Sequence, residues 1–212
     1  GTDSGNGVHT IPTYWTSKHV ITVGAINDAT NNMSTFSNWG TTDDGRIKPD
    51  VVAPGVNIVS CHYNDEDGNG VYDDYVPLAD QYSGTSMAAP AVTGITALLI
   101  ESYRDEYLEV PDSRLTPLPS TIKALLCQSA DDMGNAGPDY QFGYGGIRAD
   151  AARQLILDRR FREGVMLANN DQDIYNFSVS AGDPEIRFTL AWDDFPAGAG
   201  NPNPTIINDL DI

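Results

Sequence analysis

The stretch SGTSMAAPAVTG, residues 83–94, changes at Ser86 from small polar residues to an almost entirely apolar run. Apolar residues then recur at helical spacing, so the pattern predicts a helix from Ser86 to about residue 103. A serine at this place either caps the helix through its oxygen or acts as a nucleophile beside the free N–H groups of the first turn. The rest of the chain has to decide between these two roles.

Two sets of residues in this helix repeat at helical spacing and are candidates for burial. The first set is Val92, Ile95 and Leu99, and the second is Ala91, Leu98 and Ser102. Pro90 falls in the first turns, where the missing N–H does least harm.

Strands and helices alternate along the first three quarters of the chain. Residues 19–26 (HVITVGAI) predict a buried strand, and residues 51–59 predict two brief strands around a Pro54-Gly55 turn. Further helices are predicted at 119–130 and 148–161. This alternation predicts an α/β fold with a largely parallel sheet.

The character of the sequence changes after Gly164. The segments 174–180 (IYNFSVS) and 185–192 (EIRFTLAW) carry strand signals and are separated by Gly and Pro. We therefore expect two units, residues 1–164 and residues 165–212. The second unit is too short for a β-sandwich, which needs about 100 residues, so we expect it to be the start of a larger all-β domain.

The composition excludes several kinds of partner. The chain has 212 residues, of which 40% are hydrophobic, and a formal net charge of −18. Such a charge repels phosphate backbones and anionic membranes, so neither nucleic acid nor a membrane is an expected partner. No run of about 20 apolar residues is present. Cys61 and Cys127 are expected to be two separate thiols rather than a disulfide framework.

An acidic segment at residues 65–73 (DEDGNGVYD) has the spacing of a calcium-binding loop. Its candidate ligands are Asp65, Asp67, Asn69, the Val71 carbonyl and Asp73, with Gly70 at the sixth position. Alternate side chains of a tight loop converge on one centre, as a hard cation with six to eight oxygen ligands requires. The twelfth position holds Val76 instead of the usual bidentate Glu. The sequence predicts a structural Ca²⁺ site, and a solvated acidic insert is the alternative.

The segment GTSMAAP (84–90) matches the nucleophile motif of the subtilases, the subtilisin-like serine peptidases, at seven consecutive positions. Other segments resemble that family in the family's own order: ITVGAI (21–26), FSNWG (36–40), KPDVVAPGVNI (48–58), IKALLCQSADD (122–132) and FGYGGIRADAA (142–152). The resemblance covers about residues 1–157. It implies a three-layer α/β/α sandwich, and FTLAWDD (188–194) with NPTIINDLDI (203–212) resembles the start of the jelly-roll domain that follows some subtilases.

The resemblance implies a serine endopeptidase that hydrolyses polypeptide substrates through an acyl-enzyme. Ser86 would be the nucleophile, Thr85 would support the oxyanion hole, and Gly84 would let the substrate backbone approach closely. The family's Asp, His and oxyanion Asn belong to motifs upstream of Gly1 that are absent from this sequence. We therefore expect a fragment that is inactive alone, taken from a secreted protein. Its oligomeric state stays open.

Two alternative interpretations of the motif imply a different function or mechanism. A catalytically inactive subtilase homologue, kept as a binding or scaffold module, would have no chemical need for the serine. An α/β-hydrolase elbow also joins a strand to a helix through such a serine, but in that class the histidine follows it, and no histidine follows Ser86. His9, His19 and His62 precede the serine in contexts that predict surface or structural roles.

Overall fold

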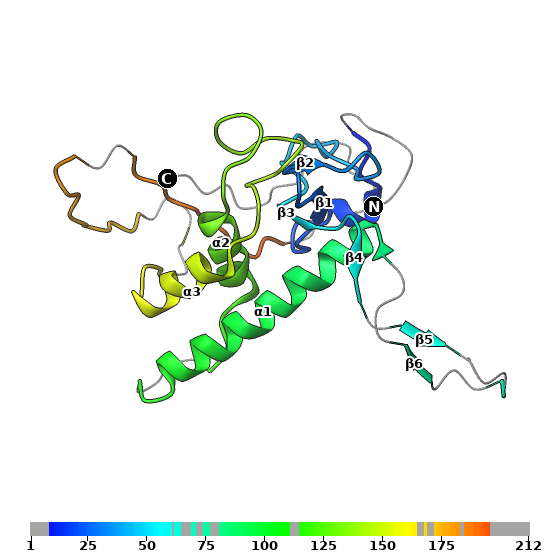
Figure 1. The fold of residues 1–212 in the computed structure, drawn as a ribbon. Coiled ribbons are helices and arrows are strands. Elements are labelled where there is room, and N and C mark those ends of the chain that lie inside the picture. Colours follow the sequence, from blue (N-terminus) through cyan, green and yellow to red (C-terminus); the bar gives the residue numbers. More distant parts are fainter. Residues whose placement is uncertain are drawn as a thin grey trace.

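The computed structural model describes residues 9–60, 62–64, 69–70, 74–76, 81–110, 115–164, 168, 172–182 and 185–195. The elements in chain order are a short 3-10 helix η1 (Thr13–Thr16), β1 (Val23–Asn27), β2 (Asn32–Met33), β3 (Val51–Pro54), β4 (Ile58–Val59), β5 (His62–Asn64), β6 (Asp74–Val76), β7 (Gln81–Tyr82), α1 (Thr85–Tyr107), α2 (Pro119–Ser129) and α3 (Ala149–Leu157). Figure 1 shows the long helix α1 running beneath the sheet, with α2 and α3 above its C-terminal half on the same side as the sheet.

The sheet at the centre of the fold has the order β2-β1-β3. β1 and β3 are parallel, with Val23 opposite Val51 and Ile26 opposite Pro54, while β2 is a brief antiparallel addition. These strands form from the β-branched runs that the sequence predicts to be buried. The α/β expectation is confirmed, and so is the turn after Pro54 that leads to β4.

The two faces of the sheet contact different parts of the chain. On one face, Ala25, Val51 and Ala53 share a core with the three helices. On the other face, Ile26 and Val52 pack against Phe142, which lies in a loop. Among the described residues, helices cover only the first face, so the second helical layer of a three-layer sandwich remains a prediction. The helical side of the core consists of Ala88, Val92, Leu99, Tyr103, Ile122, Leu125, Leu126, Cys127, Ala152 and Ile156.

The ends of the helices follow local rules. Pro119 stands at the first position of α2, where no intrahelical N–H bond is lost. The third helix is shorter than predicted because it ends at Leu157 and Arg159 takes a left-handed backbone with φ 52°. α1 is longer than predicted and begins at Thr85, one residue before Ser86.

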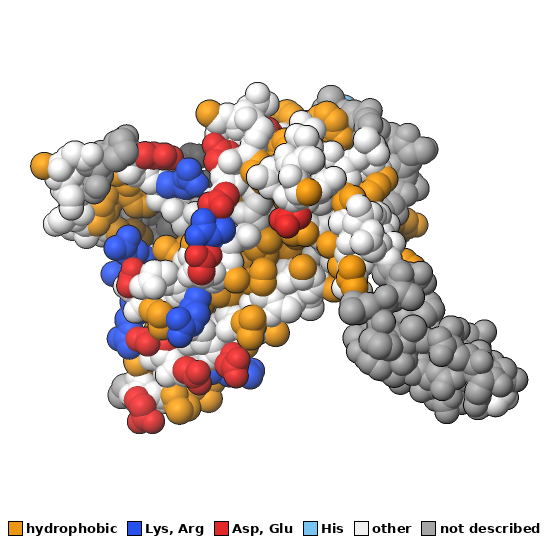
Figure 2. All heavy atoms as spheres, in the orientation of Figure 1, with side chains coloured by type: hydrophobic (Ala, Val, Ile, Leu, Met, Phe, Trp, Pro, Cys, Tyr) orange, Lys and Arg blue, Asp and Glu red, His pale blue; other side chains and the backbone are white. Residues whose placement is uncertain are grey.

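Burial of α1 differs from the expectation. Val92, Leu99 and Ser102 are buried, but Leu98 is 61% exposed and Ala91 is exposed as well. In Figure 2 hydrophobic side chains gather over α1 on the visible face. A hollow there is lined by Ile21, Val23, Ala89, Val92, Thr93 and Thr96.

The tail after residue 164 also differs from the expectation. The structure has no strand in residues 172–182 or 185–195, although both segments carry strand signals. The rings of Phe177 and Phe188 contact each other at 4.9 Å between centroids with their planes tilted by 59°, yet both side chains remain more than half exposed. A strand needs a hydrogen-bonded neighbour, and these segments have none among the described residues. The jelly-roll domain therefore remains a prediction.

Candidate functional site

Ser86 lies at the second residue of α1, on the surface. The N-cap of α1 is Gly84, and no side chain caps the helix. The Ser86 hydroxyl is therefore not the cap, which removes the first of the two roles that the sequence left open. Thr85, by contrast, is only 8% exposed. Within the described part of the chain, no hydrogen-bond partner is recorded for Ser86 Oγ, which lies exposed in the first turn of the helix.

The turn before Ser86 is held by backbone hydrogen bonds from the sheet. The amide of Gly55 donates to the carbonyl of Ile26 at 3.0 Å, and the amide of Gly84 donates to the carbonyl of Gly55 at 2.8 Å. A Cβ on Gly55 would lie 2.7 Å from the Ala25 Cβ and 2.8 Å from the Gly84 carbonyl oxygen. Only glycine allows this approach, so Gly55 positions the start of α1.

A second set of contacts holds the same turn from its other side. The amide of Asn57 donates to Ser83 Oγ at 2.9 Å. β4 and β7 are antiparallel, with Ile58 opposite Tyr82 and Val59 opposite Gln81. The three residues before Gly84 are thus fixed to the segment that follows β3.

The start of α1 offers hydrogen-bond donors toward solvent beside the hydroxyl. The first N–H groups of a helix lack intrahelical acceptors and carry a partial positive charge. The amide of Met87 is turned back to the Gly84 carbonyl at 3.1 Å. The amide of Ser86 precedes it and lies next to its own Oγ. An anionic oxygen that forms at this point would meet a donor and a favourable dipole.

No general base lies beside Ser86 in the part of the chain that the structure describes. Neither a histidine nor a carboxylate is hydrogen-bonded to Ser86 there. His9 instead lies with Nδ1 2.9 Å from Thr41 Oγ1 and is exposed, as is His19. The surface role expected for these two histidines agrees with their positions. The side chain of His62 lies outside the described residues.

The predicted calcium loop is only partly described. Asp65, Asp67, Val71 and Asp73 lie outside the described residues, and Asn69 is exposed. β5 and β6 pair in antiparallel register, with Asn64 opposite Asp74, so they enclose this segment as a hairpin loop. Figure 1 shows this hairpin extending away from the sheet and helices. Gly70 has φ 82°, the left-handed backbone that the sixth position of a calcium loop needs. Among the described residues no group of three potential metal ligands comes together.

A buried charge network near the start of β3 was not predicted from the sequence. The Asp50 carboxylate accepts hydrogen bonds from Lys48 Nζ at 2.6 Å and from the Thr22 amide at 2.7 Å, and Lys123 Nζ lies 2.9 Å away. Lys48 is 1% exposed. Burial lowers the pKa of Lys48 to about 8, although Asp50 acts in the opposite direction. The only local signal was an Asp and a Lys flanking Pro49 just before an apolar strand.

A second buried titratable group lies next to this network. Cys127 on α2 is 4% exposed, and burial raises the pKa of its thiol to about 12. A thiol with that pKa is almost entirely protonated near neutral pH and is a poor nucleophile. Cys127 is a free thiol, as expected. Cys61 lies outside the described residues.

The geometry describes an α/β protein with an unpartnered serine at a helix N-terminus, in a turn clamped by glycines. Residues 3–145 match the model of the subtilase family. The chain belongs to the subtilase family.

Several known proteins resemble this chain over most of its length. C5a peptidase of Streptococcus pyogenes is 32% identical over 154 residues, which cover 70% of this chain and 12% of that protein. The serine protease/ABC transporter B family protein tagD of Dictyostelium discoideum is 38% identical, covering 86% of this chain and 13% of that protein. The CspB protease of Clostridium perfringens superposes with a TM-score of 0.56 at 36% identity, covering 72% of this chain and 30% of that structure. The homologues are proteases, and this chain spans about an eighth of the curated relatives.

Proposed function

We propose that the chain is the nucleophile-bearing part of a serine endopeptidase that hydrolyses polypeptides through an acyl-enzyme. The observation that carries this proposal is the position of Ser86. Its exposed hydroxyl lies in the first turn of α1 and does not cap the helix, and the chain just before it is held by the hydrogen bond between Gly55 and Gly84. The subtilase family match and the protease homologues support the same reaction.

In the proposed mechanism Ser86 Oγ attacks the carbonyl carbon of the scissile peptide bond. Its proton passes to a histidine supplied by another part of the full-length protein, and that histidine then protonates the leaving amine. The Ser86 amide, supported by Thr85, holds the oxyanion, and Gly84 lets the substrate backbone approach. Water then hydrolyses the ester. Residues 1–212 alone lack this base and are expected to be inactive, since loss of one such group lowers turnover by about 10⁶ in subtilisin.

The exposed side of α1 supports a longer catalytic unit. Ala91, Gly94, Ala97 and Leu98 are exposed together on this helix. A helix that is apolar on more than one side is normally buried on more than one side. We infer that the outer face of α1 packs against a part of the full-length protein that lies outside residues 1–212.

A fluorophosphonate probe tests the nucleophile in the full-length protein. We expect a single adduct on Ser86 and none in Ser86→Ala, with Ser83→Ala as the matched control that still labels. Labelling at another serine would end the assignment. Absence of labelling in a folded full-length protein would favour the inactive, scaffold-type homologue.

We also propose that the 65–73 loop binds a structural Ca²⁺ and that the full-length protein is secreted. The alternating carboxylates of the sequence and the positive φ of Gly70 support the calcium site. Secretion rests on the family resemblance and the calcium-type loop. Within the described residues no helix is long and apolar enough to cross a membrane.

A further inference from the structure

Residues 187–195 run along the outer side of α2, although the sequence placed them in a separate unit. Gln128 donates from Nε2 to the carbonyl of Arg187 at 3.1 Å and accepts from Thr189 Oγ1 at 2.7 Å. At the other end of the helix, Ser120 Oγ donates to Asp193 Oδ2 at 3.2 Å. The two segments are antiparallel. One glutamine thus satisfies both a backbone and a side-chain group of the tail.

The spacing of these contacts fits an extended chain against a helix. From Ser120 to Gln128 the helix rises about 12 Å, at 1.5 Å per residue. From Thr189 to Asp193 an extended chain covers about 13 Å, at 3.3 Å per residue. The two lengths agree, so the tail keeps its contacts at both ends of α2 without a bulge. We call residues 187–195 the strap.

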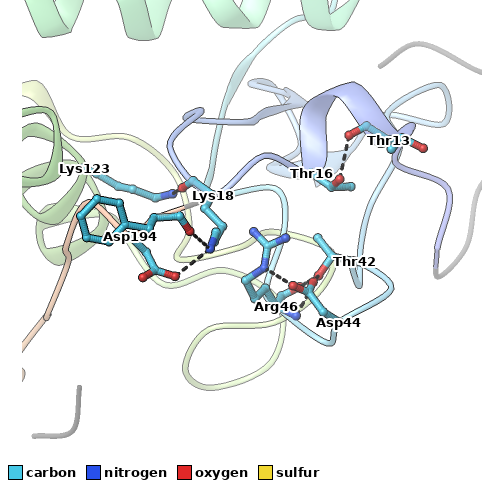
Figure 3. Close-up of polar contacts among 9 residues, drawn as sticks. Thr13, Thr16, Lys18, Thr42, Asp44, Arg46, Lys123 and Asp194 are labelled. Atoms are coloured by element: carbon cyan, nitrogen blue, oxygen red, sulfur yellow. Dashed lines mark hydrogen bonds and ion pairs between the residues drawn. The ribbon is translucent and has the colours of Figure 1, made fainter. Parts of the chain in front are cut away.

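The strap ends in a largely buried ion pair. Lys18 Nζ lies 2.7 Å from Asp194 Oδ2 and donates to the carbonyl of Phe195, also at 2.7 Å. The two side chains are only 16% and 5% exposed. Figure 3 shows Asp194 and Lys123 converging on Lys18 from different parts of the chain. A carboxylate as buried as Asp194 is strongly unfavourable unless it is paired, so the Lys18 ammonium is needed where it stands.

Lys18 also joins the strap to the charge network under β3. Its carbonyl accepts from Lys123 Nζ at 3.0 Å, and Lys123 Nζ pairs with Asp50, which pairs with Lys48. All three lysines of the chain therefore lie in one network. Without Asp194, the Lys18 ammonium would lose the carboxylate with which it pairs. The strap supplies the second negative charge.

We propose that the strap is part of the α/β unit, with the face formed by α2 and Lys18 as its docking site and Asp194 as its latch. The change in residue pattern after residue 164 then does not mark a boundary between two folding units. This inference does not depend on peptidase activity.

The test measures how fast Lys18 reacts with acetic anhydride in the full-length protein, by peptide mass spectrometry. A Ser86→Ala background removes self-cleavage, so the outcome is separate from that of the proposed function. Asp194→Asn should raise the acetylation rate of Lys18 by at least about fivefold, because the ammonium loses its buried partner. Asp105→Asn, on an exposed carboxylate of α1 away from the strap, is the matched control and should stay within twofold of the parent.

Hydrogen exchange and a variant with exchanged charges distinguish loss of the strap contact from general misfolding. Asp194→Asn should speed exchange at the Thr22 amide and in α2 by about tenfold or more, with α3 following only if the whole unit opens. Exchanging the charges with Lys18→Asp/Asp194→Lys should recover most of the protection. A loss of protection from hydrogen exchange that the control variant does not share supports the strap, whether the loss is limited to α2 or extends to α3. Equal acetylation and exchange in Asp194→Asn and Asp105→Asn would overturn it.

Discussion

Gly55 and Gly84 are joined by a backbone hydrogen bond of 2.8 Å that fastens the start of α1 to the residue that follows β3. This approach requires glycine at position 55. On Gly55 a Cβ would overlap Ala25 and the Gly84 carbonyl. The position of Ser86 is therefore set by a strand that lies about thirty residues earlier in the chain.

Replacing Gly55 should displace Ser86. Gly55→Ala is expected to lower the free energy of unfolding by about 1–3 kcal/mol, the usual effect of overpacking a tight site. The rate of fluorophosphonate labelling of the full-length protein should fall at least tenfold. Ser60→Ala, at an exposed position on the same segment, should change neither quantity. Labelling of Gly55→Ala at the parental rate would show that the glycine contact does not position the serine.

The outer face of α1 should behave as a buried surface in the full-length protein. Leu98 is 61% exposed in residues 1–212, yet Leu98→Asp is expected to destabilise the full-length protein by about 2–4 kcal/mol, because it places a charge in an apolar interface. Leu115→Asp is the control, since Leu115 is 52% exposed in the loop before α2. Urea denaturation followed by circular dichroism measures both. Similar small effects of the two variants would mean that nothing covers α1.

Calcium removal should destabilise the protein through the 65–73 loop. At 1 mM Ca²⁺ and a dissociation constant of about 10 μM, binding contributes about 3 kcal/mol, so a chelator should lower the melting temperature. Asp65→Ala/Asp67→Ala should melt at the same temperature with and without chelator. Asp28→Ala/Asp105→Ala, at two exposed acidic positions, should keep the wild-type response. A chelator effect that survives the loop substitutions would place the ion elsewhere.

Stability should depend on pH in the alkaline range through two buried groups of opposite sign. Lys48 has a folded pKa of about 8 against 10.5 unfolded, so the unfolded state binds more protons and the free energy of unfolding rises with pH across that window. Cys127 has a folded pKa of about 12 against 9, so it lowers stability as pH rises above 9. The raised pKa of Tyr144 acts in the same direction as Cys127 above pH 10.

The two contributions can be separated by removing the thiol. In wild type, stability should rise from pH 8 to 9, flatten to about 10.5 and then fall. In Cys127→Ala the rise should continue to about pH 10.5, with a slope of up to about 1.4 kcal/mol per pH unit. Denaturant titrations at half-unit steps of pH would reveal both curves. Parallel curves for the two proteins would rule out the Cys127 contribution.

The helices could be predicted because their signals are local. Pro119 marks the start of α2, and the spacing of Val92 and Leu99 marks the buried face of α1. The exposure of Leu98 could not be predicted, since periodicity reports which residues can be buried and not whether a neighbour is present. The strands predicted in the tail are not observed for the same reason, because a strand forms only with a hydrogen-bonded partner that lies elsewhere in the chain.

The candidate site was predictable only in part. Seven consecutive residues around Ser86 were enough to single out the serine, and the structure adds the glycine contact that holds it. The lysine network and the strap left no signal in the sequence. Lys18, Asp50 and Asp194 are far apart in the chain, and their pairing depends on how α2 is placed against the sheet.

β4 and β7 pair directly, so the chain leaves the body of the molecule after Val59 and returns at Gln81 on the adjacent strand. The stretch between Val59 and Gln81 is therefore an insertion whose two ends are neighbours. Its length and chemistry can be exchanged in the laboratory while the two-strand stem keeps the turn before Ser86 in place. A protein engineer could graft a recognition element there without redesigning the parallel strands or α1.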